Sequence, residues 1–305
     1  MAISAKDVME LRRQTDCGMM ECKKALTQAD GDFAKAVEIL REQGLATASK
    51  KAGRIAAEGM VYAVSFDNCA VVVEVNAETD FVAKNEKFVE FTKELATVVA
   101  EQNPADVEAL MGCKMGEGTV DDALKALILV IKENIKVRRF ARYDGHCAAY
   151  VHGGGTHGVI VKFDTTDDVA AKAEFVAFGK DIAMQIAAAN PSYLDEAAVP
   201  ADVIAKEKEI ILAQMANDPK NANKPDAIKE KMAMGKLGKF FKENCLVNQA
   251  FIKDGNMDVT KYVAATAKEL GGDIKIVGYT HFVKGEGLEK RSEDFAAEVA
   301  AAIKG

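Results

Sequence analysis

Cysteine and histidine side chains are the first candidates for chemistry, because thiolates and imidazoles serve as nucleophiles, general bases and metal ligands. Six cysteines and four histidines are scattered along the 305 residues. Cys17 and Cys22 are near each other, but no second pair follows at the spacing of a zinc site. No nucleophile has a base near it on any expected element. The sequence therefore predicts no metal site, no cofactor and no enzymatic activity, and the scattered thiols indicate a reducing cytoplasm.

The glycine-rich residues 152–158, HGGGTHG, are a second candidate, since glycine loops can cradle phosphate groups. A P-loop needs a helix directly after it and a Gly-Lys-Ser/Thr ending, and this segment lacks both. We therefore expect a β-hairpin turn here, with His152 and Gly153 at its start.

Asp80 and Phe81 are a third candidate, between an apolar strand and an amphipathic helix. Asp80 could cap that helix and Phe81 could fold back into the core, which would be a purely structural role. The alternative is a contact with a partner protein. The residue pattern alone does not decide between the two.

Composition and charge limit the function classes. With 49% hydrophobic residues in 305 positions, the chain can bury a core and form two or three domains. Its 40 basic and 47 acidic residues give a net charge of -7, which opposes direct binding to nucleic acid. No apolar run approaches the roughly 20 residues that span a bilayer, so no membrane association is expected. A solvated sheet face is predicted for the basic residues Lys132, Lys136, Arg138, Arg139 and Arg142.

Residues 1–55 are expected to form a small helical module. Ser4 and Asp7 have the spacing of a capping box, which predicts a first helix that ends near residues 15–18. A third helix should begin after Asp32 and end at Gly44. Because three short helices bury little surface, we expect this module to be held by docking.

An internal duplication organises the central part of the chain. The matching segments are strands at 70–75 and 158–163, helix starts at 88–93 and 175–180, and strands at 135–140 and 274–279. With one more strand at its start, each copy reads strand, strand, helices, strand. We therefore predict an α+β fold with a duplicated core of two small antiparallel sheets covered by helices. The core subdomains are predicted at residues 56–144 and at 145–195 with 246–286.

The second copy contains an insert, residues 196–245, in which two helical patterns flank a turn rich in Pro and Asn. A narrow apolar stripe and charged flanks predict an antiparallel coiled-coil hairpin that projects into solvent. Residues 287–305 form a separate C-terminal helical module in this prediction. Phe295 and Val299 lie on the apolar stripe of its helix.

Two segments closely resemble the signature sequences of the elongation factor Ts family. They are residues 11–26, LRRQTDCGMMECKKAL, and residues 74–84, EVNAETDFVAK. Many family members have a Gly-x-Gly turn where this chain has Asp16, Cys17 and Gly18, and Asp is compatible with such a turn. The resemblance implies a UBA-like fold for residues 1–55 and extends over essentially the whole chain.

What the resemblance implies is a guanine nucleotide exchange factor that binds elongation factor Tu in its GDP-bound and nucleotide-free forms. In the family, the aromatic residue of the second signature wedges between helices of the partner, so that bound magnesium loses its coordination and GDP dissociates. The positions that match this wedge are Thr79, Asp80, Phe81 and Val82. The positions that match contacts of the helical module are Arg12, Met19 and Met20. For the two methionines, the alternative is a position in the core of the module.

Further contacts follow from the same resemblance. His152 and Gly153 match a hairpin that meets the partner outside its nucleotide domain, and a terminal helix like the one with Phe295 and Val299 grips the partner in the family. The hairpin insert serves dimerisation in some members, so a homodimer is also an expectation. The alternative function is a dimeric scaffold with a peptide-binding helical module. Nucleotide-sensitive association with elongation factor Tu would distinguish the two.

Overall fold

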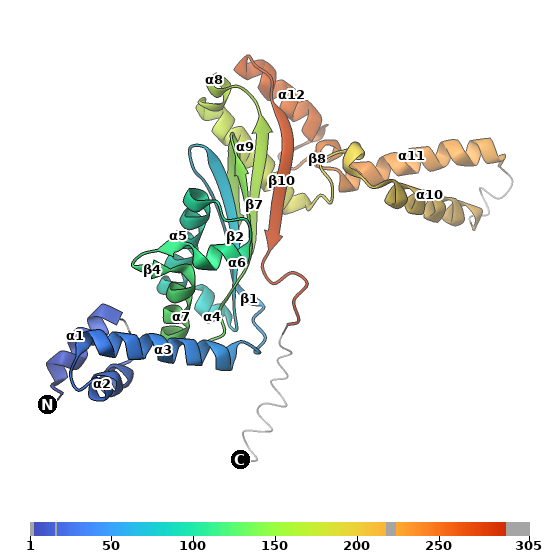
Figure 1. Cartoon of the computed structure of the whole chain (residues 1–305). Helices are drawn as coiled ribbons and strands as arrows, with labels where there is room; N and C mark the ends of the chain where they lie inside the picture. The colour runs from blue at the N-terminus through green and yellow to red at the C-terminus, as the bar shows by residue number, and fades with distance from the viewer. Residues whose placement is uncertain (1–2, 16, 218–223, 291–305) are drawn as a thin grey trace.

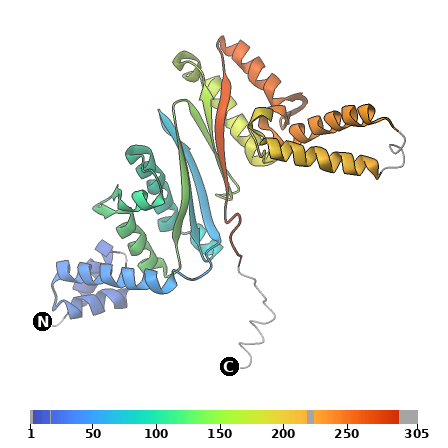
Figure 2. The ribbon, with the colours of Figure 1, turned by 45° about the vertical axis from the view of Figure 1, so that its right-hand side comes forward.

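The computed structural model describes residues 3–15, 17–217 and 224–290. Two three-stranded antiparallel sheets form its centre, each with helices on its outer face (Figure 1). The N-terminal helices lie at one end of this body, beside the helices of the first sheet. A pair of long helices extends away from the side of the second sheet (Figures 1 and 2).

The first copy of the duplicated unit has the strand order β1-β2-β5. Its elements are β1 (Glu58–Ser65), β2 (Cys69–Ala77), α4 (Asp80–Ala83), α5 (Glu86–Gln102), α6 (Val107–Gly112), β3 (Lys114–Met115), β4 (Gly118–Thr119), α7 (Val120–Ile131) and β5 (Lys136–Asp144). The short hairpin β3–β4 directly precedes α7, and Thr119 caps that helix through a hydrogen bond from the Asp122 amide.

The second copy repeats this topology with the order β6-β7-β10. Its elements are β6 (Cys147–His152), β7 (His157–Asp164), α8 (Asp167–Ala170), α9 (Ala173–Ala189), η1 (Glu196–Ala198), η2 (Leu246–Asn248), β8 (Ala250–Phe251), β9 (Asp254–Asp258), α12 (Val259–Leu270) and β10 (Lys275–Val283). The predicted order of strand, strand, helices, strand is therefore confirmed. Both copies have a shift in strand register at the same place. It lies at residues 137–139 of β5 in the first copy and at residues 276–278 of β10 in the second.

The two sheets pack face to face, so β2 is buried along its whole length. Val61, Val72 and Ile160 belong to the layer of apolar side chains between the sheets. Gly158 in β7 allows this close approach, because a Cβ atom there would lie 2.4 Å from Val61 Cγ1. The helices of each copy cover the other face of its own sheet, as Figure 1 shows.

The N-terminal helices are α1 (Ala5–Thr15), α2 (Met19–Gln28) and α3 (Phe33–Lys51). The capping box is confirmed, because the Ser4 amide donates to Asp7 Oδ2 at 3.0 Å and the Asp7 amide donates to Ser4 Oγ at 3.2 Å. The predicted helix end at Gly44 is wrong. Gly44 is buried inside α3, where a Cβ atom would lie only 3.1 Å from the Lys125 carbonyl oxygen, so the glycine serves helix packing against α7. Leu129 of α7 completes the module's core, so the module docks on the first copy.

The inserted segment contains α10 (Ala201–Ala216) and α11 (Asp226–Asn244). The two helices pack on each other through a small apolar cluster of Ile211, Met215, Ala233 and Leu237. The predicted turn falls mostly on residues 218–223, outside the described part of the chain. The terminal helix predicted with Phe295 and Val299 also lies outside the described residues.

Lys132 and Lys136 are exposed as predicted, but Arg138 and Arg139 of β5 are half-buried and do not belong to a solvated face. Glu74 is fully buried, and its carboxylate lies 3.0 Å from Arg138 Nη1 and 2.6 Å from Arg139 Nε. The Gly285 amide donates to the same carboxylate at 2.8 Å. Burial alone would raise the pKa of Glu74, but these hydrogen bonds and one from Asn76 outweigh it and lower the pKa. This cluster attaches the segment after β10 to the first copy.

Candidate partner-binding face

The turn that carries Phe81 is a single helical turn, α4, directly after the buried strand β2. Its N-cap is Thr79, so Asp80 is the first helical residue and not the cap. Asp80 forms an exposed ion pair with Lys84 at 3.6 Å. Val82 is buried in the core of the first copy, which fixes the turn and leaves its own side chain unable to reach a partner. This corrects our expectation that Val82 contacts a partner directly.

Phe81 does not fold back into the core. It is 79% exposed, more than any other large hydrophobic residue in the described part of the chain. Helix geometry explains this, because consecutive residues of α4 point in different directions and Val82 takes the inward one. An aromatic side chain held in water on a fixed turn can make a protein contact without first paying a large conformational cost.

The second copy shows that the fold itself does not require an aromatic residue here. In α8, Val169 is buried as Val82 is in α4, so Asp168 occupies the position of Phe81. Because Val169 is buried, it is not the counterpart of the exposed Phe81. The same backbone turn accepts a carboxylate at this exposed position, and Phe81 is therefore an addition specific to the first copy.

The loop between α7 and β5 holds this turn in place. The Thr79 amide donates to Glu133 Oε2 at 3.0 Å, and the Thr79 hydroxyl donates to Glu133 Oε1 at 2.7 Å. The Asn134 amide donates to Glu78 Oε1 at 2.6 Å. Both ends of the short connection between β2 and α4 are therefore bound to one loop.

The two methionines of the N-terminal module are not core residues. Met19 is 47% exposed and Met20 is 64% exposed at the start of α2, and Arg12 is exposed on α1. Glu21 caps the first turn of α2 by accepting from the Gly18 amide at 2.9 Å, and it also lies 2.5 Å from Lys132 Nζ. Since Lys132 precedes Glu133, one loop connects the start of α2 to the Phe81 turn.

His152 and Gly153 lie at the expected β-hairpin turn, between β6 and β7. Tyr150 Oη lies 2.9 Å from His152 Nδ1, which orients the exposed imidazole. The Val61 amide donates to the Gly155 carbonyl at 2.8 Å, so the hairpin tip rests on β1. This interaction places the tip at the same end of the sheets as α4.

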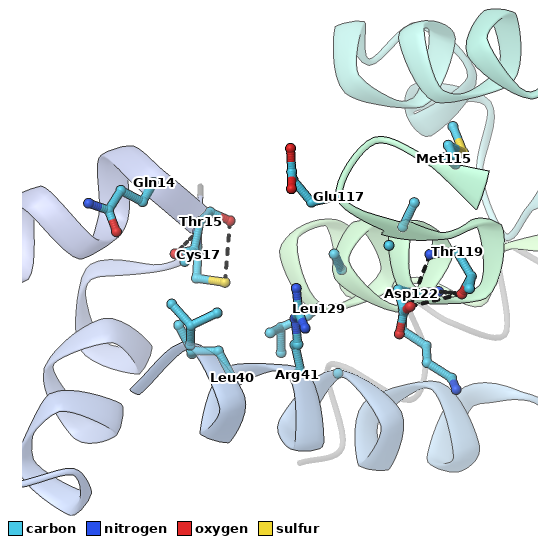
Figure 3. A pocket seen from close by; sticks show the side chains of 16 residues that line it. Gln14, Thr15, Cys17, Leu40, Arg41, Met115, Glu117, Thr119, Asp122 and Leu129 are labelled. Atoms are coloured by element: carbon cyan, nitrogen blue, oxygen red, sulfur yellow. Dashed lines mark hydrogen bonds between the residues drawn. The ribbon is translucent and has the colours of Figure 1, made fainter. Parts of the chain in front are cut away.

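A cavity of about 320 Å³ lies where the N-terminal module meets α7 and the β3–β4 hairpin (Figure 3). Cys17, Leu40 and Arg41 line one side, and Met115, Glu117 and Leu129 are among the residues of the other. Among the described residues, none of those predicted to contact a partner lines it. Within residues 3–15, 17–217 and 224–290, no group of three metal-ligating side chains occurs, and no helix is long and apolar enough to cross a membrane.

Sequence reasoning did not single out Glu133. Its partner Thr79 is far away in the chain, and a carboxylate at the end of a helix has no distinctive local pattern. A signal was nevertheless present in the duplication, because Ile135 matches Ile274. Continuing that match backwards places Lys132 and Glu133 opposite Gly271 and Gly272.

Comparison with known proteins agrees with the two signatures and the duplicated fold. Residues 78–286 match the family model described as "Elongation factor TS". The chain is similar to elongation factor Ts of Syntrophotalea carbinolica, with 47% identity over 100% of both chains. It is also similar to elongation factor Ts of Clostridium botulinum, with 48% identity over 98% of both, and of Trichlorobacter lovleyi, with 46% over 99% of both. The chain belongs to the elongation factor Ts family of translation elongation factors.

Proposed function

We propose that this chain is a guanine nucleotide exchange factor that binds elongation factor Tu in the cytoplasm and accelerates GDP release during translation elongation. The observation that supports this most directly is Phe81, an aromatic side chain 79% exposed on a turn whose neighbours are fixed. Family membership supplies the partner. The chemistry needs no nucleophile or general base, because exchange breaks no covalent bond.

Phe81 acts as a wedge in this proposal, with Asp80 beside it at the partner surface. A phenylalanine presents about 200 Å² of surface, so burial of the exposed part removes roughly 160 Å² from water and contributes about 4 kcal/mol. Magnesium requires nearly ideal octahedral coordination, so a small displacement of its ligands weakens its hold on the diphosphate. A contribution of about 4 kcal/mol corresponds to roughly a thousandfold change in nucleotide affinity.

Thermodynamic linkage sets the direction of the cycle. A factor that binds the nucleotide-free partner more tightly than the GDP-bound form must lower the affinity for GDP by the same factor. By the same linkage, GTP binding lowers the partner's affinity for the factor and releases it. The factor is thus released unchanged and acts repeatedly.

A second point of contact supports the first. Met19 and Met20 present flexible apolar side chains at the start of α2, with Arg12 on α1, and we assign them to the nucleotide-binding domain of the partner. Two contacts on one chain raise the effective concentration of the wedge at its target. His152 and Gly153 are assigned to a contact outside that domain, and Phe295 and Val299 to the terminal helix.

The decisive experiment measures release of fluorescently labelled GDP from purified elongation factor Tu. Substoichiometric amounts of this chain should accelerate release, and excess unlabelled GTP should complete the exchange. A release rate unchanged by the chain would refute the proposal.

Dimerisation through the hairpin is a second proposal with its own observation. Ile210 is 41% exposed on α10, and Ile228 and Met234 are 48% and 59% exposed on α11. These apolar side chains are available to a second copy. Sedimentation of the wild type and of an Ile228→Lys variant would test this, and a monomer at all accessible concentrations would contradict it. The alternative scaffold function needs no GTP-binding partner, so it predicts no nucleotide-sensitive association with elongation factor Tu.

A further inference from the structure

The two copies of the core differ at one place in a way that points to an additional positioning residue. In the second copy, the N-cap Thr166 is followed by two acidic residues, Asp167 and Asp168, at the positions of Asp80 and Phe81. In the first copy, Phe81 replaces the second of these carboxylates. There the N-cap Thr79 donates from its amide and its hydroxyl to Glu133, from the loop before β5.

The loop before the last strand of each copy also differs between the two copies. Gly271 ends α12 with a left-handed backbone, at φ 72°, and Lys132 ends α7 at φ 64° although it has a side chain. Gly272 follows in the second copy, where a Cβ atom would lie 2.5 Å from Val169 Cγ2 and no side chain fits. Glu133 occupies this position in the first copy and reaches Thr79. The exposed aromatic residue and the carboxylate that binds Thr79 thus occur together, in the first copy only.

We propose that Glu133 is a positioning residue that fixes the α4 turn so that Phe81 points outward before the partner arrives. This inference rests on the exchange function proposed above and adds a residue that need not touch the partner. Two hydrogen bonds to one charged acceptor restrain the backbone amide and the side chain of Thr79 together. Lys132 extends the same restraint to α2 through Glu21, at 2.5 Å.

The test compares three variants with the wild type: Glu133→Ala, Glu133→Gln, and Glu101→Ala as a control at an exposed glutamate of α5. GDP release is measured as a function of the concentration of elongation factor Tu·GDP, together with hydrogen exchange of the Thr79 amide in the isolated chain. Glu133→Ala should lower the maximal release rate about tenfold, because hydrogen bonds to a charged group are lost. The KM for the partner should stay within about twofold, since the Met19 and Met20 contact is unchanged.

Rescue provides the readout that a general loss of stability would not give. Glu133→Gln keeps an acceptor oxygen, so it should retain an intermediate rate and part of the Thr79 protection, while Glu101→Ala matches the wild type. Should Glu133→Ala fail to fold, Glu133→Gln carries the test, with a lower maximal rate and lower Thr79 protection at an unchanged KM as the expected result.

The outcomes separate the two proposals. A maximal rate and Thr79 protection equal to wild type in Glu133→Ala would overturn the positioning role. A wild-type chain that does not accelerate GDP release would refute the exchange function, and loss of Thr79 protection in Glu133→Ala would then still establish that Glu133 fixes the turn. Equal effects on rate and KM, with no rescue by Glu133→Gln, would identify a merely structural residue and also overturn the proposal.

Discussion

Replacement of Phe81 by alanine should separate function from folding, because the side chain is exposed. Of the roughly 200 Å² that a phenylalanine presents, only about 40 Å² is removed from water in the free protein, because the residue is 79% exposed. At about 25 cal/mol per Å², Phe81→Ala should cost only about 1 kcal/mol of unfolding free energy. The unfolding temperature should fall by only a few degrees.

The effect on exchange should be much larger. Burial of the remaining surface against the partner contributes up to about 4 kcal/mol, which corresponds to a loss of up to roughly a thousandfold in the rate of GDP release. Stopped-flow fluorescence of labelled GDP measures this rate, and circular dichroism measures thermal unfolding on the same preparation.

Val82→Ala is the matched control, because Val82 lies next in the chain but points into the core. It should lose about 2 kcal/mol of stability while exchange below its unfolding temperature remains near that of the wild type. An exchange rate of folded Phe81→Ala within about twofold of wild type would refute the wedge. A stability loss for Phe81→Ala as large as that for Val82→Ala would show that Phe81 packs inward, against the geometry described above.

Three further predictions concern other side chains of the protein. The double variant Met19→Ala, Met20→Ala should raise the KM for elongation factor Tu about tenfold with little change in maximal rate or stability, as titrated GDP release will show. Glu74→Gln should cost about 3 kcal/mol in thermal unfolding, because it leaves two arginines without their buried counter-charge. Burial, followed by the neighbouring His157, lowers the pKa of His281 below 6.5, so the unfolded chain binds more protons there. Stability should therefore fall as pH drops below about 6.5, and urea unfolding at about pH 7 and about pH 5.5 should show a smaller difference in His281→Gln.

The duplicated sheet could be predicted from the sequence because its signal is local and repeated. Strands β2 and β7 are covered on both faces, so they read as continuous apolar runs that are easily matched to each other. The N-cap of α1 could also be predicted from the sequence, since Ser4 and Asp7 interact across three positions.

The predictions that the structure contradicts have a common physical origin, because each of these residues makes a contact with a distant segment of the chain. Gly44 has the local pattern of a helix end, but the close approach of Lys125 on α7 gives it a packing role inside α3. Arg138 and Arg139 lie between the apolar residues Val137 and Phe140 in a strand with further basic residues, which locally resembles a solvated strand, yet one buried carboxylate binds both. The position of Glu74 inside the sheet packing is not visible in any window of the sequence.

The duplication also provides an internal control for the candidate site. Features that folding requires recur in both copies, as shown by Asn103 and Asn190, which end α5 and α9 with the same left-handed backbone. Phe81, Lys132 and Glu133 depart from their counterparts, and all three lie where the loop before β5 meets the α4 turn. An exposed phenylalanine and a lysine in a left-handed conformation are each unfavourable for an isolated fold. Their joint occurrence in one copy only, beside a carboxylate that binds Thr79, is what the proposed partner contact at this turn requires.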